Sequence, residues 1–336
     1  MVCSPRREFL LRSARWFAGA SGVLGVLSSD CLHTFAADRK ETAVPASSPL
    51  PIVDTHQHLW DLSRFDLPWT KGEEVASLNR SYLMSDYLRA TEGLNIVKAV
   101  YMEVDVHPSQ QAQEAKYVLD IIRQGNTPTV AAVISGRPNS EEFRAYIEPF
   151  AKEPEIKGVR QVLHVGSTPA GYCLQPQFVK GIQLLGELGL SFDLCMRAGE
   201  IVDAVKLVDQ CPKTRFIVDH CGNLSVQSKD PALRERWKKG MSELAQRENV
   251  VCKISGIVAS AKPGAWTADD LAPNIHFSLE TFGKERVMFG GDWPVCTLAA
   301  SYRQWLDALK KIVSDWSEAD RRKLFHDNAV RFYGLS

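Results

Sequence analysis

Short apolar runs rich in Val and Ile recur along the chain from residue 51 onward, and longer segments of mixed polarity separate them. Apolar runs of this length, bounded by turn residues, are typical of buried strands. We expect eight strands, at residues 51–56, 97–104, 129–135, 156–163, 190–196, 215–220, 249–255 and 286–292. Nearly continuous apolar strands are buried on both faces, as in a parallel sheet that helices cover.

The segments between these runs predict the covering helices. Apolar residues recur at three- and four-residue spacing at 111–124, 176–189, 198–211 and 232–247. Eight strand–helix units favour a closed (β/α)8 TIM barrel, one catalytic domain over residues 51–336, over an open doubly wound sheet. No G-x-G-x-x-G follows the first strand, which argues against a dinucleotide-binding fold.

Residues 59–90 form a long connection between the first two predicted strands. Loops this long are usually functional or disordered, and Trp60 and Trp69 argue against disorder. We expect this segment to wall or cover the pocket.

The first residues differ from the rest of the chain, because two arginines precede an uncharged apolar run that ends at Leu27. The stretch SPRREFLLRSA resembles a twin-arginine export signal. The resemblance implies a signal peptide at 1–37, a linker at 38–50, and a periplasmic protein carried across by the twin-arginine export machinery. The apolar run is shorter than the roughly 20 residues of a spanning helix, so no stable membrane span is expected in the mature form. The alternative is a cytoplasmic protein with an amphipathic N-terminal helix.

Charge and cysteine content narrow the expected function. Lys and Arg number 40 and Asp and Glu number 40, so the formal net charge is zero and nucleic acid is not an expected partner. The eight cysteines include no C-x-x-C pair, and several lie beside apolar runs. We expect buried thiols, without a role as nucleophile or structural zinc site.

Candidate chemistry gathers where the predicted strands end, which is where a barrel of this kind places its active site. These strand-end polar residues are His56 and His58, Glu103 and Asp105, Arg160 and His164, Asp193 and Arg197, Asp219 and His220, Lys253 and Ser255, and Asp292. Histidines at positions i and i+2 project to one side of a strand. The pair suits one divalent ion, zinc by its chemistry, with His220 and Asp292 completing the set. Asp54 and Asp219 are interpreted as supports for the histidines that follow them.

Several of these segments together resemble the amidohydrolase superfamily. The motifs are DTHQHLW, GVRQVL, LGLSFDL, FIVDHCGNL, VCKISGI and RVMFGGDWPV. They are similar to the amidohydrolase-related branch that contains L-fuconolactonase-like and dicarboxylate-type lactonases. The resemblance implies a hydrolase in which Asp292 acts as general base toward water. His56, His58 and His220 would then either hold a metal or donate hydrogen bonds to the carbonyl oxygen, so metal-dependent and metal-independent catalysis both remain open.

The chain departs from the superfamily's two-metal pattern. Metal-dependent members often carry a bridging Lys or Glu at the fourth strand and a His at the fifth, where this chain has Arg160 and Asp193. A two-metal site is therefore not expected. Esters and lactones need less help with their leaving group than amides do, so the departure favours a lactonase.

Cations and aromatic residues near the predicted strand ends suggest a small-molecule substrate. Arg160, Arg197 and Lys253 could bind a carboxylate or the hydroxyls of a sugar lactone. Trp60, Trp69 and Trp293 could supply stacking surface. The mixture of cations with nearby acids favours a sugar lactone. A metal-dependent decarboxylase and a non-catalytic ligand-binding barrel are the two alternatives.

Overall fold

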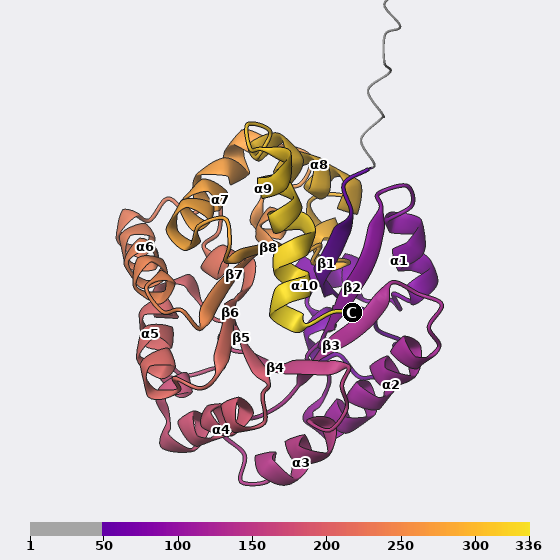
Figure 1. Ribbon diagram of the computed structural model, residues 1–336, viewed down its shortest axis with the longest axis vertical. Helices are drawn as coiled ribbons and strands as arrows, with labels where there is room; N and C mark the ends of the chain where they lie inside the picture. Colours follow the sequence, from indigo (N-terminus) through magenta and orange to yellow (C-terminus); the bar gives the residue numbers. More distant parts are fainter. Residues whose placement is uncertain (1–48) are drawn as a thin grey trace, which may run out of the picture. The chain divides into compact units, whose positions relative to one another are not determined.

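Eight parallel strands pair in sequence order in the computed structural model, which describes residues 49–336 (Figure 1). The strands are β1 Ile52–Gln57, β2 Ile96–Met102, β3 Thr129–Ser135, β4 Ile156–Val162, β5 Ser191–Cys195, β6 Arg215–Val218, β7 Val250–Ile254 and β8 Val287–Phe289. Two contacts close the ring between β8 and β1. The Thr55 hydroxyl donates to the Phe289 carbonyl at 2.6 Å, and the Asp292 N–H donates to the His56 carbonyl at 2.8 Å.

Helices surround the strands and confirm the (β/α)8 prediction (Figure 1). They are α1 Met84–Ala90, α2 Gln111–Arg123, α3 Phe143–Phe150, α4 Pro176–Glu187, α5 Ile201–Gln210, α6 Pro231–Ala245, α7 Ala268–Phe282, α8 Tyr302–Ile312, α9 Glu318–Arg322 and α10 Asn328–Tyr333. The four helices predicted from apolar spacing correspond to α2, α4, α5 and α6.

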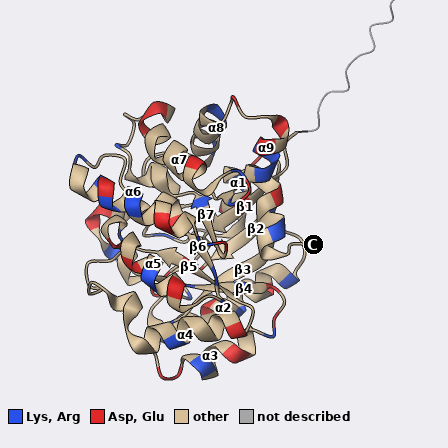
Figure 2. Ribbon diagram, turned by 60° about the vertical axis from the view of Figure 1, so that its left-hand side comes forward, with Lys and Arg blue, Asp and Glu red and all other residues tan. Residues whose placement is uncertain are grey.

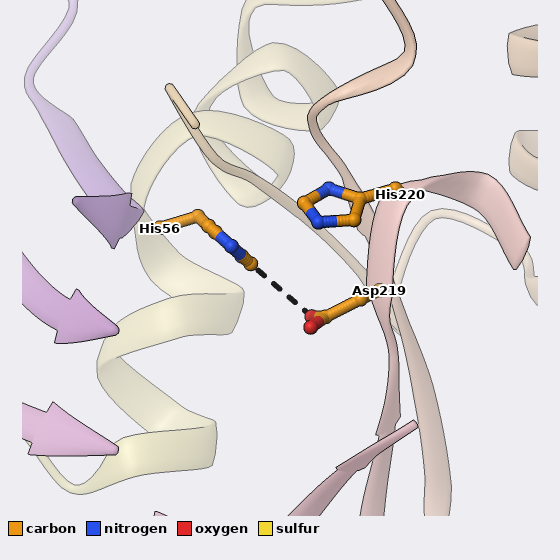
Figure 3. Close-up of side chains that lie close together, drawn as sticks. All are labelled: His56, Asp219 and His220. Carbon is orange, nitrogen blue, oxygen red and sulfur yellow. Dashed lines mark ion pairs between the residues drawn. The ribbon is translucent and has the colours of Figure 1, made fainter. Parts of the chain in front are cut away.

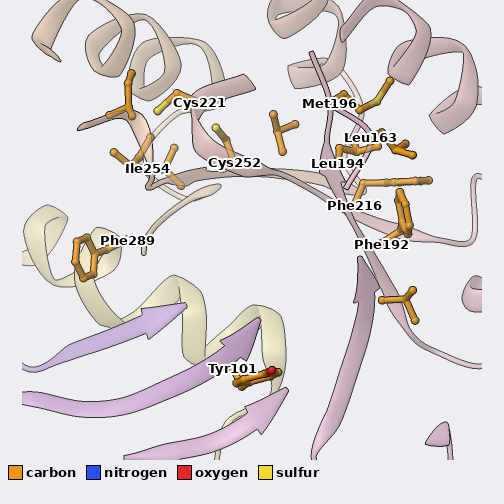
Figure 4. Close-up of a cluster of buried hydrophobic side chains, with 14 of the residues drawn as sticks. Tyr101, Leu163, Phe192, Leu194, Met196, Phe216, Cys221, Cys252, Ile254 and Phe289 are labelled. Carbon is orange, nitrogen blue, oxygen red and sulfur yellow. The ribbon is translucent and has the colours of Figure 1, made fainter. Parts of the chain in front are cut away.

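The strands bury opposite faces in two different environments. One face packs against the helices in a large apolar cluster that includes Phe192, Phe216 and Phe289 (Figure 4). The other face points into the barrel, where a second apolar cluster includes Val133, Ile217 and residues of α10. Both faces are dehydrated, which explains why the strands read as continuous apolar runs rather than as alternating ones.

Most of the predicted strands end one to three residues earlier than expected, and two of these differences concern site residues. The sixth, predicted at 215–220, ends at Val218, and the eighth, predicted at 286–292, ends at Phe289. Left-handed backbone conformations at His220 (φ 52°) and Asp292 (φ 51°) interrupt the extended geometry. Both residues therefore lie in turns directly after their strands.

Residues 59–90 are ordered as predicted. They contain two 3-10 helices, Pro68–Lys71 and Glu73–Leu78, followed by α1. The Trp69 indole N–H donates to the Val104 carbonyl at 2.8 Å, which ties this segment to the end of β2.

Lys, Arg, Asp and Glu are interspersed over the outer helices (Figure 2), consistent with the balanced charge of the sequence. The six cysteines in residues 49–336 are all buried and unpaired, which confirms the expectation of buried thiols for that part of the chain. No helix among the described residues is long and apolar enough to cross a membrane. The predicted signal peptide at 1–37 and nearly all of the predicted linker at 38–50 lie outside the described residues.

Candidate active site

The carboxyl ends of the strands surround a cavity of about 330 Å³. Six of the strand-end candidates line it: His58, Asp105, Arg160, His164, His220 and Asp292. Much of the remaining wall is apolar and comprises Trp69, Val104, Val162, Val165, Ala259 and Val295. Polar groups converging in an apolar cavity at the C-terminal end of a TIM barrel are the usual form of an active site in this fold.

Asp54 fixes the junction of β1 and β8. Its Oδ1 accepts from the backbone N–H groups of His56 (2.9 Å) and Gly291 (2.7 Å), and its Oδ2 accepts from the hydroxyls of Tyr87 and Tyr302, both at 2.9 Å. Burial raises the pKa of Asp54, although the four hydrogen bonds oppose that shift. Asp54 therefore holds the backbone at His56 and at Gly291, the residue before Asp292.

His58 directs its Nε2 at Asp292. The His58 Nδ1 lies 2.9 Å from the Met102 carbonyl, which can only accept, so Nδ1 carries a proton. In the neutral ring, Nε2 therefore carries a lone pair, and it lies 3.3 Å from Asp292 Oδ1. Two acceptors this close require a proton or a cation between them.

His56 is held between Arg160 and two carboxylates. Its Nε2 lies 3.1 Å from Arg160 Nη1 and 3.6 Å from Asp292 Oδ1, while its Nδ1 lies 3.6 Å from Asp219 Oδ1 (Figure 3). Burial, with the nearby positive charges of Lys253 and Arg160, lowers the pKa of His56 well below its ordinary value. The ring is neutral at physiological pH, with Nε2 accepting from the guanidinium and Nδ1 carrying the proton.

His220 reaches the cavity from the left-handed turn after β6. Its Nδ1 lies 3.0 Å from the Ser255 hydroxyl, and its ring centroid lies 4.5 Å from that of His56 (Figure 3). Burial lowers the pKa of His220, so this imidazole is also neutral at physiological pH. When Ser255 donates to Nδ1, the His220 Nε2 carries the proton and can serve as a hydrogen-bond donor.

Gly256 makes room for the His220 ring. A Cβ atom at this position would lie 2.1 Å from His220 Nδ1, and the backbone φ is +61°. We expect Gly256→Ala to displace the ring and to lower kcat/KM at least tenfold in whatever reaction the site catalyses. Gly264→Ala is the matched control, because Gly264 has φ +69° and no atom within 4 Å of the added Cβ. It should carry only the backbone cost of about 1–2 kcal/mol. A folded Gly256→Ala enzyme with wild-type kcat/KM would contradict this assignment.

A layer of buried ion pairs lies beneath these histidines. Lys253 Nζ lies 2.5 Å from Asp193 Oδ2 and 3.3 Å from Asp219 Oδ1, and all three side chains are fully buried. Burial raises the pKa of Asp193 to about 7 even though Lys253 opposes the shift. Burial would also raise the pKa of Asp219, but the positive charges of Lys253 and Arg160 help to hold it below its ordinary value. Asp219 is thus a buried carboxylate beside the His56 ring.

Arg160 is bound by a carboxylate of the same layer. Its Nε donates to Glu103 Oε1 at 2.6 Å, and its Nη2 donates to the Glu103 backbone carbonyl at 2.7 Å. The guanidinium lines the cavity, yet most of its donors are already used inside the protein.

The structure corrects several predicted substrate contacts. Lys253 is fully buried beneath the cavity. Trp60 is also buried, and its indole N–H donates to the Arg80 carbonyl. Trp293 packs against Tyr82 and Tyr87, the latter on α1. None of the three lines the cavity, because the barrel interior or the 59–90 segment encloses them.

Arg197 belongs to a neighbouring cavity of about 780 Å³ and does not line the first one. Its guanidinium donates to the carbonyls of Val165 and Thr168 and to Glu200 Oε1, at 2.6–2.8 Å. His164 and Asn223 lie between the two cavities and line both. Asn223 was not anticipated, and only its position three residues after His220 in a turn could have suggested it.

The donor groups fit one divalent ion in part. The nitrogen and oxygen atoms of His56, His58 and Asp292 lie within 4.8 Å of one another, as do those of His56, Asp219 and His220. His58 Nε2 and Asp292 Oδ1 face each other at 3.3 Å, and a cation of the zinc type could bind between them. At His56, an ion would have to share Nε2 with the Arg160 guanidinium.

Comparison with known proteins places these features in context. The sequence pattern of the family described as Amidohydrolase matches residues 53–335. L-fucono-1,5-lactonase of Burkholderia multivorans is 28% identical over 298 residues, covering 84% of this chain and 96% of its own. L-rhamnono-gamma-lactonase of Scheffersomyces stipitis is 24% identical over 341 residues, covering 86% of this chain and all of its own.

Solved structures share the barrel. An amidohydrolase from Burkholderia multivorans, with bound zinc, superposes with a TM-score of 0.76 at 24% identity, covering 85% of this chain and all of its own. Because the identity is low, the likeness establishes a common fold and does not transfer the metal.

Proposed function

This chain belongs to the amidohydrolase family, and from that premise we propose that it hydrolyses a cyclic ester, a sugar lactone. One observation carries the proposal: the Asp292 carboxylate lies at the cavity beside the imidazole nitrogens of His58 (3.3 Å) and His56 (3.6 Å). Two lactonases among the relatives support the choice of a lactone.

Asp292 would act as the general base. The water oxygen attacks the lactone carbonyl carbon while Asp292 takes a proton from the water. The ring C–O bond then breaks, and Asp292 returns the proton to the departing ring oxygen. The product is an open hydroxy acid, whose carboxyl group releases one proton at neutral pH.

His220 and Arg160 would stabilise the carbonyl oxygen as it gains negative charge. Both line the cavity, and both can direct N–H groups toward it. Ser255 orients the His220 ring and Glu103 orients the guanidinium, so neither donor has to reorganise during the reaction.

One divalent ion, zinc by its preferred ligands, would be held by His56, His58 and Asp292. When bound, it would supply Lewis-acid polarisation of the carbonyl group. Arg160 already supplies positive charge beside His56, so the same side chains also support hydrolysis without an ion.

The alternatives have less support from the site. A decarboxylase must bind the substrate carboxylate, and apart from an ion the one Lys or Arg that lines the cavity among the described residues is Arg160. Glu103 already pairs with it. A non-catalytic binding barrel has no need for Asp292 beside two imidazole rings. Export to the periplasm is a separate proposal, which rests on the N-terminal sequence alone.

The test measures metal content and turnover on one preparation. We expect acid release from neutral aldonolactones above the spontaneous rate, and no carbon dioxide from hydroxybenzoates. Elemental mass spectrometry should find about one zinc per chain, and chelation should lower turnover. If metal-free protein kept its full turnover, the proposed catalytic ion would be refuted, while the proposed lactone hydrolysis would still hold. Carbon dioxide release without acid release would refute the lactonase.

A further inference from the structure

Asp105 lies in a left-handed backbone conformation at the edge of the cavity. Its φ is 48°, and it follows β2 by three residues. This region is uncommon for residues other than glycine, although aspartate is among the residues that tolerate it. The Asp105 N–H donates to Glu103 Oε2 at 2.7 Å, so the carboxylate that binds Arg160 also fixes this turn.

One carboxylate oxygen of Asp105 is bound and the other is available. Arg137 Nη2 donates to Asp105 Oδ1 at 2.9 Å. Within residues 49–336, no group donates a hydrogen bond to Oδ2. The Asp105 side chain is 29% exposed and lines the cavity, whereas Arg137 does not line it. The Asp105 carboxylate at the cavity wall therefore keeps one oxygen able to accept a hydrogen bond, while Arg137, which binds the other oxygen, does not line the cavity.

The charges at the cavity favour a neutral ligand. Asp105 and Asp292 are its two carboxylates, and Arg160 is the one Lys or Arg side chain among the described residues that line it. Glu103 neutralises Arg160 through a contact of 2.6 Å. Among the side chains that line the cavity, a ligand carboxylate near Asp105 would meet that acid and no unpaired Lys or Arg, while a hydroxyl could donate to Asp105 Oδ2.

We propose that Asp105 is a specificity-determining residue that accepts a hydrogen bond from a substrate hydroxyl and repels a substrate carboxylate. The site would thus select neutral hydroxylated lactones over lactones that carry an acid. This inference rests on the proposed lactonase function.

The experiment compares three lactones with the full-length enzyme. Glucono-1,5-lactone is neutral and hydroxylated, δ-valerolactone has no hydroxyl, and glucaro-1,4-lactone carries a carboxylate. Asp105→Asn keeps a residue that tolerates the left-handed turn and removes the charge. Asp105→Gly removes the whole side chain without backbone strain. Asp66→Asn is the control, because Asp66 is exposed and does not line the cavity.

For Asp105→Gly we expect the ratio of kcat/KM for the hydroxylated lactone to that for δ-valerolactone to fall at least tenfold, mainly through KM. For Asp105→Asn we expect the ratio of the carboxylated to the hydroxylated lactone to rise severalfold, and the rise should shrink in high salt. Asp66→Asn should change neither ratio.

The outcomes separate this inference from the function on which it rests. If the wild-type enzyme hydrolyses no lactone of any kind, the proposed function fails. If it hydrolyses the neutral lactones while both Asp105 variants keep the wild-type ratios, the lactonase stands and the role of Asp105 is overturned.

Discussion

Replacing Asp292 by asparagine is expected to lower kcat for lactone hydrolysis by about 10²–10⁴-fold, the usual contribution of a general base. An amide has the same shape as the carboxylate but cannot take a proton from water. The carboxylate also faces the His58 and His56 nitrogens at 3.3 and 3.6 Å, so the change removes the charge at the centre of the site.

The fold should survive this change. The backbone N–H and carbonyl of Asp292 are both hydrogen-bonded, to the His56 carbonyl and the Cys296 N–H at 2.8 Å each, and asparagine keeps both bonds. Asparagine also tolerates the left-handed conformation at this position. Circular dichroism and the urea midpoint serve as controls for folding. A folded Asp292→Asn enzyme with wild-type kcat would refute the assignment of the base.

The second large effect concerns stability. Lys253→Met should lower the free energy of unfolding by about 3–5 kcal/mol, because it leaves the buried carboxylates of Asp193 and Asp219 without their shared cation. Urea denaturation measures the loss. Lys206→Met, at an exposed pair with Asp203 (2.8 Å), is the matched control and should change stability little.

The loss should depend on pH in a definite direction. Burial already raises the pKa of Asp193 to about 7, and removing Lys253 removes a group that lowers it. A carboxyl whose folded pKa exceeds its unfolded pKa stabilises the fold at low pH, and this stabilisation is lost as pH rises through the folded value. The destabilisation by Lys253→Met should therefore be larger at pH 8 than at pH 5. Adding Asp193→Asn should recover part of it, and a loss independent of pH and of Asp193 would contradict the account.

The sequence predicts the barrel well because one physical requirement determines the pattern. Strands that pack on helices outside and on other strands inside must be apolar on both faces, so β3 was located at its observed bounds, residues 129–135. The ends of β6 and β8 were less predictable. There the backbone adopts a left-handed conformation at His220 and Asp292, and the hydrophobic pattern of the sequence does not predict that conformation.

The histidines and Asp292 of the site could be predicted from the sequence, whereas the role of each cation could not. His56, His58, His220 and Asp292 were located from strand-end positions, and the structure brings them together. Lys253 and Arg160 were both assigned to the substrate. Only Arg160 lines the cavity, because Lys253 pairs with acids from other strands. Which cations are used internally depends on pairing between distant strands, and a single sequence does not show it.

Hydrolysis of a neutral aldonolactone in ¹⁸O-labelled water tests the central claim most directly. The account predicts, at a rate well above the spontaneous one, a hydroxy acid with one ¹⁸O in its carboxylate, because water attacks the carbonyl carbon. Label in the hydroxyl group instead, or acid formation no faster than the spontaneous rate, would contradict it.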